Sequence, residues 1–407
     1  MNLQVLVTHP GRQHSHQLVK ALHREDMLAE YWTGVPARPL TSVSALRPLV
    51  GPLEKHALLP IPDDRVRHFL LEPIVRRATA WMSPGQQVDW SHWAMEQFDR
   101  WCADRLEEAD ADAVVAYENG ALHTFRRAKE LGMTTILDAA SFHHAWQDDV
   151  YDYVESSAVH ERINDHKDAE IELADHILTV SSLARESYVD GGADADRVTS
   201  VPVGCDLDRF RISSDDVSSQ EDAPFTFIFA GHAGHRKGID LLLDAASRLE
   251  DEGQNVQIWV AGGEDPNVEW SRSSLVKRLG RLPQPELADR FRQADCLVLP
   301  SRHDSFGMVV VEAMATGLPV IVTENVGAKE AVTEGVSGWI ILAEDADALY
   351  EQMRWCIQNH EDVRRMHKAA RRDASAYSWE AYHRRVIHHL QNIVGSIRSR
   401  SSAPSNL

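Results

Sequence analysis

The feature that most constrains the fold is a series of short, unbroken apolar runs, each followed by a segment with helical periodicity. Because these runs do not alternate apolar with polar residues, they are typical of strands that are buried on both faces of a parallel sheet. Strands that alternate with helices predict βαβ units and doubly wound sheets. The expected strands are residues 3–8, 113–117, 135–137, 176–180, 198–203, 225–230, 256–261, 296–299, 319–322 and 338–342.

A polar, acidic and serine-rich stretch at residues 213–224 directly precedes one of these strands. Because similar βαβ patterns lie on both sides of it, the stretch indicates a linker between two Rossmann-like halves. A length of 407 residues also fits two domains. We predict an N-terminal domain over residues 1–212, a C-terminal domain over 224–375, and a final helix over 376–397 that packs back on the N-terminal domain. Residues 35–100 predict helical insertions, and the Ser/Arg-rich end from residue 396 predicts a frayed tail.

Charge and composition narrow the class of protein. A formal net charge of −20 argues against nucleic acid as a partner, because a phosphate backbone repels such a surface. The four cysteines lie far apart without a Cys-x-x-Cys pair, which favours a reducing compartment over a disulfide framework. The sequence shows no signal peptide and no apolar run long enough for a transmembrane segment, so a cytoplasmic protein is expected.

A glycine-containing loop follows the strand expected at residues 225–230. It begins at Gly231, carries Arg236 and Lys237, and ends at Gly238, where a helix is expected to begin. Backbone N–H groups and the helix dipole create positive potential at such a place, and two cations beside it suit a diphosphate. An ordinary βα turn with solvated basic residues fits this loop equally well, and neither a Walker motif nor a Gly-x-Gly-x-x-Gly pattern accompanies it.

A second loop follows the strand expected at residues 296–299. Asp304 lies in this loop, and Glu312 lies on the helix that follows it. Both carboxylates can therefore face the crevice at the carboxyl ends of the strands, where open α/β sheets bind ligands. They can accept hydrogen bonds from sugar hydroxyls, although a turn-capping Asp304 and a surface Glu312 are the simpler alternative.

These motifs recur in order with others, including Pro300-Ser301 at the start of the second loop, Gly317-Leu318-Pro319 after its helix, and Gly327 with Glu330. Together they resemble the retaining glycosyltransferases of family 4. The resemblance covers residues 170–380 well and residues 1–150 weakly. It implies the GT-B fold, in which two Rossmann-like parallel-sheet domains face a central cleft.

The resemblance implies a role for each matching residue. Lys237 matches the lysine that holds the donor diphosphate, and Asp304 and Glu312 match the carboxylates that touch the donor sugar and the ribose. Asp304 is one methylene shorter than the glutamate usual in the family. A histidine at position 232 replaces the usual arginine, which leaves Arg236 as a substitute. The other implied donor-binding positions in this half are His232, Arg236, Arg281, Leu282, Ser305, Phe306 and Gly307.

The N-terminal half is expected to supply the acceptor side. Gly11 follows the first strand, where GT-B enzymes run a glycine loop beneath the phosphates, and it permits close backbone approach. His143 follows another strand, in a segment that resembles one in which a histidine touches the donor sugar. We therefore predict Asp304, Lys237 and His143 as the catalytic residues. Without a His-Glu-x-x-His or similar spacing, we expect no protein-held metal and no other cofactor.

The resulting hypothesis is a retaining, nucleotide-sugar-dependent hexosyltransferase. It would move a sugar from a nucleoside-diphosphate sugar to a hydroxyl acceptor, which can be a sugar, a lipid-linked sugar or a small molecule. Two alternatives stay open. One is a non-catalytic GT-B-like protein that binds sugar nucleotides, which Asp304 and His232 would favour. The other is a sugar-nucleotide epimerase or a phosphorylase of the same fold.

Overall fold

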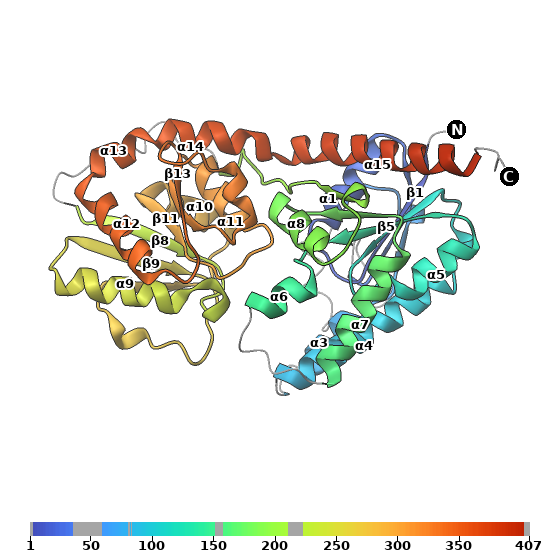
Figure 1. Cartoon of the computed structure of the whole chain (residues 1–407), viewed down its shortest axis with the longest axis horizontal. Helices are drawn as coiled ribbons and strands as arrows, with labels where there is room; N and C mark the ends of the chain where they lie inside the picture. Colours follow the sequence, from blue (N-terminus) through green and yellow to red (C-terminus); the bar gives the residue numbers. More distant parts are fainter. Residues whose placement is uncertain are drawn as a thin grey trace. The chain divides into compact units, whose positions relative to one another are not determined.

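The computed structural model describes residues 3–35, 59–79, 82, 84–150, 158–210 and 223–402. The chain divides into two compact units (Figure 1). The first consists of Met1–Thr179, Arg185–Val201 and His383–Leu407, and the second of Val180–Ala184 and Pro202–Tyr382. The domain limits predicted at residues 212, 224 and 375 stay predictions, because the linker at residues 213–224 lies almost wholly outside the described residues.

The first unit is built on a seven-stranded parallel sheet in the order β3-β2-β1-β4-β5-β6-β7. The core on one face of this sheet joins Leu6 and Val114 to Phe98 and Phe125 of two covering helices, and none of these side chains is more than 1% exposed. The strands are β1 (Val5–His9), β2 (Leu28–Thr33), β3 (Val66–His68), β4 (Ala113–Tyr117), β5 (Thr134–Ala139), β6 (His176–Thr179) and β7 (Val198–Ser200). The helices are α1 (Ser15–Arg24), α3 (Leu71–Ala78), α4 (Pro84–Ala103), α5 (Leu122–Glu130), α6 (His144–Val150), α7 (Ala158–Leu173) and α8 (Ser182–Asp190).

The second unit repeats the plan with a six-stranded parallel sheet in the order β10-β9-β8-β11-β12-β13. Figure 1 shows helix α9 on one side of this sheet and α10 and α11 on the other, as right-handed crossovers require. The strands are β8 (Phe225–Ala230), β9 (Val256–Ala261), β10 (Val276–Gly280), β11 (Cys296–Leu299), β12 (Val320–Thr323) and β13 (Gly338–Ile341). The helices are α9 (Ile239–Asp251), α10 (Gln284–Gln293), α11 (Met308–Ala315), α12 (Ala346–Gln358), α13 (His360–Arg365), α14 (His367–Ala374) and α15 (Trp379–Ser402), and α15 runs on into the first unit.

Each sheet has a point at which the strand order reverses. In the first unit this point lies between β1 and β4, and in the second it lies between β8 and β11. Loops that leave the carboxyl ends of two such strands diverge to opposite faces of the sheet and leave a crevice, which is where doubly wound folds bind ligands. The fold therefore marks one candidate site in each unit.

The predicted α/β class with two parallel sheets is confirmed, and every predicted apolar run overlaps a strand. Three strands were missed, namely β2, β3 and β10. In the 35–100 region, α3 and most of α4 are helical as predicted, but this region also contributes β3 to the sheet, and residues 36–58 lie outside the described residues. The expectation of a frayed end from residue 396 is wrong up to Ser402, where α15 ends, and residues 403–407 lie outside the described residues.

Candidate functional site

Two loops flank the reversal point of the second sheet. One runs from β8 to α9 and carries Lys237, and the other runs from β11 to α11 and carries Asp304. The first loop closes with a 3-10 turn, His235–Lys237, and then Gly238 in the left-handed conformation with φ of 66°. A Cβ at Gly238 would lie 1.9 Å from the Pro300 carbonyl oxygen. A glycine is thus required for the two loops to pack together here.

This packing brings the side chains of Lys237 and Asp304 into an ion pair. Lys237 is 8% exposed, although it carries a charge. Burial lowers the pKa of Lys237, and the nearby Arg236 adds to this effect, whereas Asp304 opposes it. A buried ammonium group at the start of a helix interacts strongly with phosphate, because little water screens it. The two residues predicted to be catalytic in this half are therefore in direct contact.

A buried arginine between the loops was not predicted from the sequence. Arg302 donates to both carboxylate oxygens of Asp240 at 2.7 and 2.8 Å and to the carbonyl oxygen of His235 at 2.6 Å. It also pairs with Glu344. Since Asp240 lies on α9, this arginine fixes the β11–α11 loop to the start of α9 and so holds Lys237 and Asp304 in place. Its partner lies 62 residues away in the sequence, and no local pattern signals the pair.

Backbone N–H groups gather at the start of α11. Gly307, the residue before this helix, has φ of 85°, and a Cβ there would lie 2.9 Å from Val326 and 3.2 Å from the Asp304 carboxylate. The carbonyl groups of Ser305 and Phe306 accept hydrogen bonds from the Ser181 hydroxyl and the Ala328 N–H, both at 2.6 Å. Within the described part of the chain, the N–H groups of Ser305, Phe306 and Gly307 find no acceptor. They can therefore donate to an anionic or hydroxyl-rich ligand, and the binding role of these three residues stays a prediction.

Glu312 lies on α11 and is only 7% exposed. Burial raises the pKa of Glu312 to about 7, although the positive charge of Arg209 acts in the opposite direction. No residue among those described donates a hydrogen bond to this carboxylate. A buried carboxylate without a partner is costly, which indicates that a ligand supplies the missing donors.

We expect Glu312→Gln to stabilise the fold in a pH-dependent way. The carboxyl group holds its proton up to about pH 7 in the folded state but only to about pH 4.5 when unfolded. The wild type should therefore lose about 3 kcal/mol of its free energy of unfolding as the pH rises through this window, and the amide should not. Urea denaturation at pH 5 and pH 8 measures the difference, with the exposed Glu286→Gln as control. Equal pH dependence of the two variants and the wild type would contradict this account of Glu312.

The same substitution should weaken binding of the donor. If Glu312 accepts hydrogen bonds from a ribose, the loss of charge-assisted acceptance costs about 1.5–3 kcal/mol, or roughly tenfold or more in dissociation constant. Calorimetric titration of the nucleoside diphosphate at pH 8 checks this value. If the variant bound the nucleoside diphosphate with normal affinity, the prediction that Glu312 contacts the donor would be contradicted.

The remaining predicted residues of this unit lie nearer the surface. The exposed His232 pairs with Asp265 at 2.6 Å. A Cβ at Gly263 would lie 3.0 Å from both His232 and Arg281, so these two side chains meet over this glycine. Leu282 is half-buried beyond the end of β10. The Arg236 guanidinium donates to the His303 carbonyl oxygen at 3.3 Å and so joins the two loops.

The first unit places Gly11 directly after β1, at the reversal point of its sheet. The Gly11 N–H donates to Nδ1 of His9 at 2.9 Å. A Cβ at Gly11 would make only ordinary contacts, the nearest at 3.5 Å, so the protein itself does not require glycine here. A cavity of about 420 Å³ adjoins this loop and is lined by polar side chains that include Arg12, Gln13 and Arg76.

A buried pair that sequence reasoning missed ties this loop to another strand. Nε2 of His14 lies 2.9 Å from the Asp138 carboxylate, and both side chains are 8% exposed. Burial alone would lower the pKa of His14, but the Asp138 carboxylate outweighs it and raises the pKa. Because Asp138 belongs to β5, the pair crosses over the end of β4 and links the Gly11 loop to the segment that leads to His143.

His143 lies just before α6, on the same edge of the first sheet. Its N–H donates to the Ser187 hydroxyl at 3.0 Å, and its ring packs on Gly191, where a Cβ would lie 2.7 Å from the ring. Burial lowers the pKa of His143 to about 4, so its imidazole is neutral at pH 7. A fixed, neutral imidazole can exchange hydrogen bonds with a sugar hydroxyl. The catalytic and binding roles of all these residues stay predictions.

Comparison with known proteins finds a family match within the second half of the chain. Residues 211–373 match the family model for glycosyl transferases group 1. D-inositol 3-phosphate glycosyltransferase 1 from Catenulispora acidiphila is 32% identical over 209 residues, or 46% of this chain and 50% of that protein. The corresponding enzyme from Geodermatophilus obscurus is 32% identical over 225 residues, or 50% and 49% of the two chains. The chain thus spans about half the length of the curated relatives that it matches.

Solved structures match over almost the whole chain. Sucrose-phosphate synthase from Thermosynechococcus elongatus has a TM-score of 0.71 at 19% identity and covers 97% of this chain and 100% of its own. Anabaena HepE, solved in complex with UDP, has a TM-score of 0.67 at 15% identity and covers 96% and 100%. None of the described helices is both long and apolar enough to cross a membrane. The chain has the GT-B fold, and its residues 211–373 are similar to the glycosyl transferases group 1 family.

Proposed function

We propose that the protein is a retaining hexosyltransferase that moves a sugar from a nucleoside-diphosphate sugar to a hydroxyl acceptor. The observation that carries this proposal is the Lys237–Asp304 ion pair at the reversal point of the second sheet, beside the free N–H groups of the α11 start. The Lys237 cation and the amide groups suit the diphosphate of a nucleotide sugar, and the Asp304 carboxylate suits the sugar of the same donor. The solved complex of HepE with UDP and glucose, a neighbour of the same fold, is consistent with such a donor.

The reaction is proposed to proceed on one face of the sugar. The bond from the anomeric carbon to the diphosphate oxygen breaks, and the acceptor oxygen bonds to the same face. The acceptor's proton passes to the leaving phosphate oxygen. Asp304 is a poor nucleophile while it is paired with Lys237, which favours this route over a covalent intermediate. Lys237, Arg236 and the α11 amides would stabilise the phosphate as its charge develops.

The acceptor is proposed to bind in the first unit, in the cavity beside Gly11. Arg12, Arg76 and Gln13 supply donors there for a hydroxyl-rich molecule, and Glu72 lines the same cavity. A sugar, a lipid-linked sugar or a small polyol would fit these contacts, whereas nucleic acid would be repelled by the net charge of −20. The four buried, unpaired cysteines support a reducing, cytoplasmic location.

A product analysis tests the proposal. The protein is incubated with UDP-, GDP- and ADP-hexoses and a panel of acceptors, and the products are examined by NMR. We expect a glycoside whose anomeric configuration equals that of the donor. Inversion would contradict the retaining route. An isomerised sugar nucleotide without glycoside would indicate an epimerase, and binding without any product would indicate a non-catalytic protein.

We expect the transferase to need no metal ion. The charges of Lys237 and Arg236 and the amides of the α11 start can together neutralise the diphosphate, which is the task that a divalent cation performs in metal-dependent transferases. Activity should therefore survive prolonged treatment with EDTA followed by gel filtration. A strict loss that Mg²⁺ or Mn²⁺ restores would refute this expectation.

A further inference from the structure

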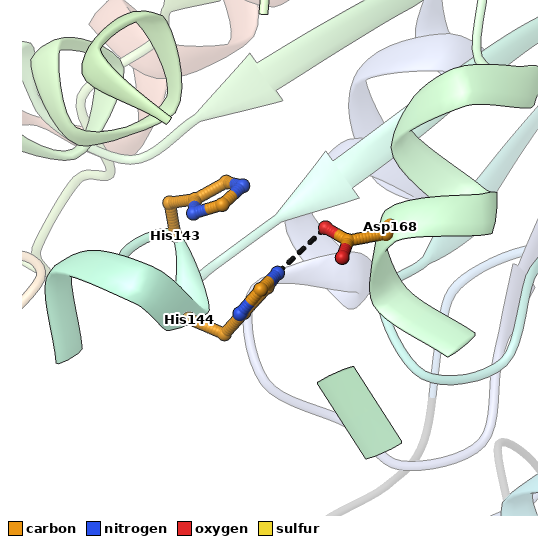
Figure 2. Close-up of side chains that lie close together, drawn as sticks. All are labelled: His143, His144 and Asp168. Carbon is orange, nitrogen blue, oxygen red and sulfur yellow. Dashed lines mark hydrogen bonds and ion pairs between the residues drawn. The ribbon is translucent and has the colours of Figure 1, made fainter. Parts of the chain in front are cut away.

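Two histidines and an aspartate lie together at the edge of the first unit, outside the donor loops. His143 and His144 stand at the start of α6, and Asp168 lies on α7. One ring nitrogen of each histidine and one oxygen of Asp168 all lie within 4.8 Å of one another. Figure 2 shows the His144 ring directed at the Asp168 carboxylate, and the two rings stack with their centroids 4.3 Å apart. Two imidazoles and a carboxylate form a ligand set typical of zinc.

We propose that His143, His144 and Asp168 form a binding site for Zn²⁺, and that the bound ion inhibits the protein by capturing His143. The binding half of this proposal stands on the geometry alone. The inhibitory half rests on the proposed function, in which His143 meets the donor sugar. The ion is an inhibitor in this account, so the site is compatible with a reaction that needs no metal.

Each histidine can offer a lone pair with a small local change. Nε2 of His144 lies 2.6 Å from the Asp168 carboxylate. If the ring proton of His144 moves to Nδ1, Nε2 has a free lone pair, and a metal ion can bind between this nitrogen and the carboxylate. Nδ1 of His143 accepts from the Ala145 N–H at 3.2 Å, a long hydrogen bond in the first turn of α6 that an ion can replace. Three protein ligands leave a fourth position of a tetrahedral ion open to water.

The ligands are held in place without an ion. A second histidine–aspartate pair joins the same two helices, since His160 lies 2.9 Å and 3.0 Å from the two Asp148 oxygens. Asn164 also donates to Asp148 at 3.0 Å. On the other side, Ser187 and Gly191 fix His143. Because these contacts fix the ligand-bearing segments, binding of an ion causes little loss of conformational entropy.

The three ligands differ in how far they are buried, and this difference determines how an ion enters the site and how tightly it binds. The side chain of Asp168 is 58% exposed, while that of His144 is 12% exposed and His143 is buried. An ion can therefore enter from the Asp168 side. Lys167 acts on His143 as a nearby positive charge and opposes a second cation there. We expect a dissociation constant in the micromolar range. Occupancy would then follow the concentration of the free ion, unlike at a structural zinc site, which binds its ion much more tightly.

Binding is tested on the full, tag-free chain with Co²⁺ and Zn²⁺. We expect one high-affinity Co²⁺ per chain with the visible absorption of low-coordinate Co²⁺, displaced by Zn²⁺ in calorimetry. His144→Gln and Asp168→Asn keep the hydrogen bond between the helices but lose a ligand, so each should weaken binding by about tenfold or more. His160→Gln is the matched control, because it alters the neighbouring pair on the same helices, and it should bind as the wild type does.

Three results would overturn the site: no binding to the wild type, unchanged binding in both ligand variants, or an equal loss in His160→Gln. These outcomes need no transferase assay, so they are independent of the proposed function. In the assay, Zn²⁺ should inhibit the wild type and His160→Gln, while Asp168→Asn keeps its basal rate and needs at least about tenfold more Zn²⁺. If metal bound without inhibition, the proposed Zn²⁺ site would stand, but the proposed inhibition through coordination of His143 would be refuted.

Discussion

Lys237→Ala should lower turnover by roughly 10²–10³ at saturating donor. Its ammonium group is the buried cation at the start of α9, and no nearby described lysine can replace it. Arg236, the adjacent cation that is also proposed to act on the phosphate, is held by the His303 carbonyl group and cannot move into the place of Lys237. Loss of Lys237 would leave the developing charge on the diphosphate without its closest partner. Steady-state kinetics with the donor identified for the wild type measure this effect.

The control for this substitution must separate catalysis from stability. Removing Lys237 leaves the Asp304 carboxylate, whose side chain is 14% exposed, without its partner, and in fully buried pairs such a loss costs about 3–5 kcal/mol. The assay is therefore run below the melting temperature of the variant. Lys329→Ala serves as the matched control, because Lys329 is half-buried in the same unit and its ammonium group donates to the Glu324 carbonyl oxygen at 2.7 Å. Turnover of Lys237→Ala within threefold of the wild type would remove Lys237 from the site.

Asp304→Ala should lower turnover by roughly 10- to 100-fold, and it should change donor affinity less. The carboxylate both orients Lys237 and lies against Gly307 at the start of α11, so it stands where the sugar and the diphosphate meet in the proposed complex. Asp304→Glu introduces the side chain that the motif resemblance leads one to expect at this position, and it should retain or raise activity. The values of kcat and KM for both variants, measured side by side, check this prediction.

The double variant Lys237→Ala/Asp304→Ala tests whether the two groups act as a unit. It removes both charges, so it should be more stable than Lys237→Ala alone and yet no more active. If the losses of turnover in the two single variants added up in the double variant, Lys237 and Asp304 would act independently in catalysis. If both Asp304 variants turned over as the wild type does, the donor sugar would not lie where the motif resemblance places it.

Much of the fold could be predicted because most strands are buried on both faces. Strand β8, for example, has six buried residues in succession and reads as one apolar run. The strands that were missed lack this signal. β3 and β10 stand at the edges of their sheets, and β10 exposes most of its side chains. In β2, the half-buried Glu30 interrupts the run because it pairs with Arg67 of β3, a contact that only the folded sheet creates.

The candidate site was predictable where its residues follow strands and was hidden where they pair across the chain. Lys237 and Asp304 stand in loops that the βα pattern marks, and their meeting follows from the strand order of the second sheet. Arg302 and the His14–Asp138 pair depend on partners 62 and 124 residues away, so no local motif reveals them. The same holds for the His144–Asp168 contact, whose spacing of 24 residues matches no familiar metal motif.

The measurement that tests the central claim most directly is the thermal stability of the wild type and Lys237→Ala in a panel of nucleotide sugars. A ligand at 100 times its dissociation constant should stabilise the folded protein by about 2.7 kcal/mol. We predict that one nucleotide sugar and its nucleoside diphosphate stabilise the wild type, and that Lys237→Ala loses most of this gain. If no nucleotide sugar or nucleoside diphosphate stabilised the wild type, the account of a donor site between the β8 and β11 loops would be contradicted.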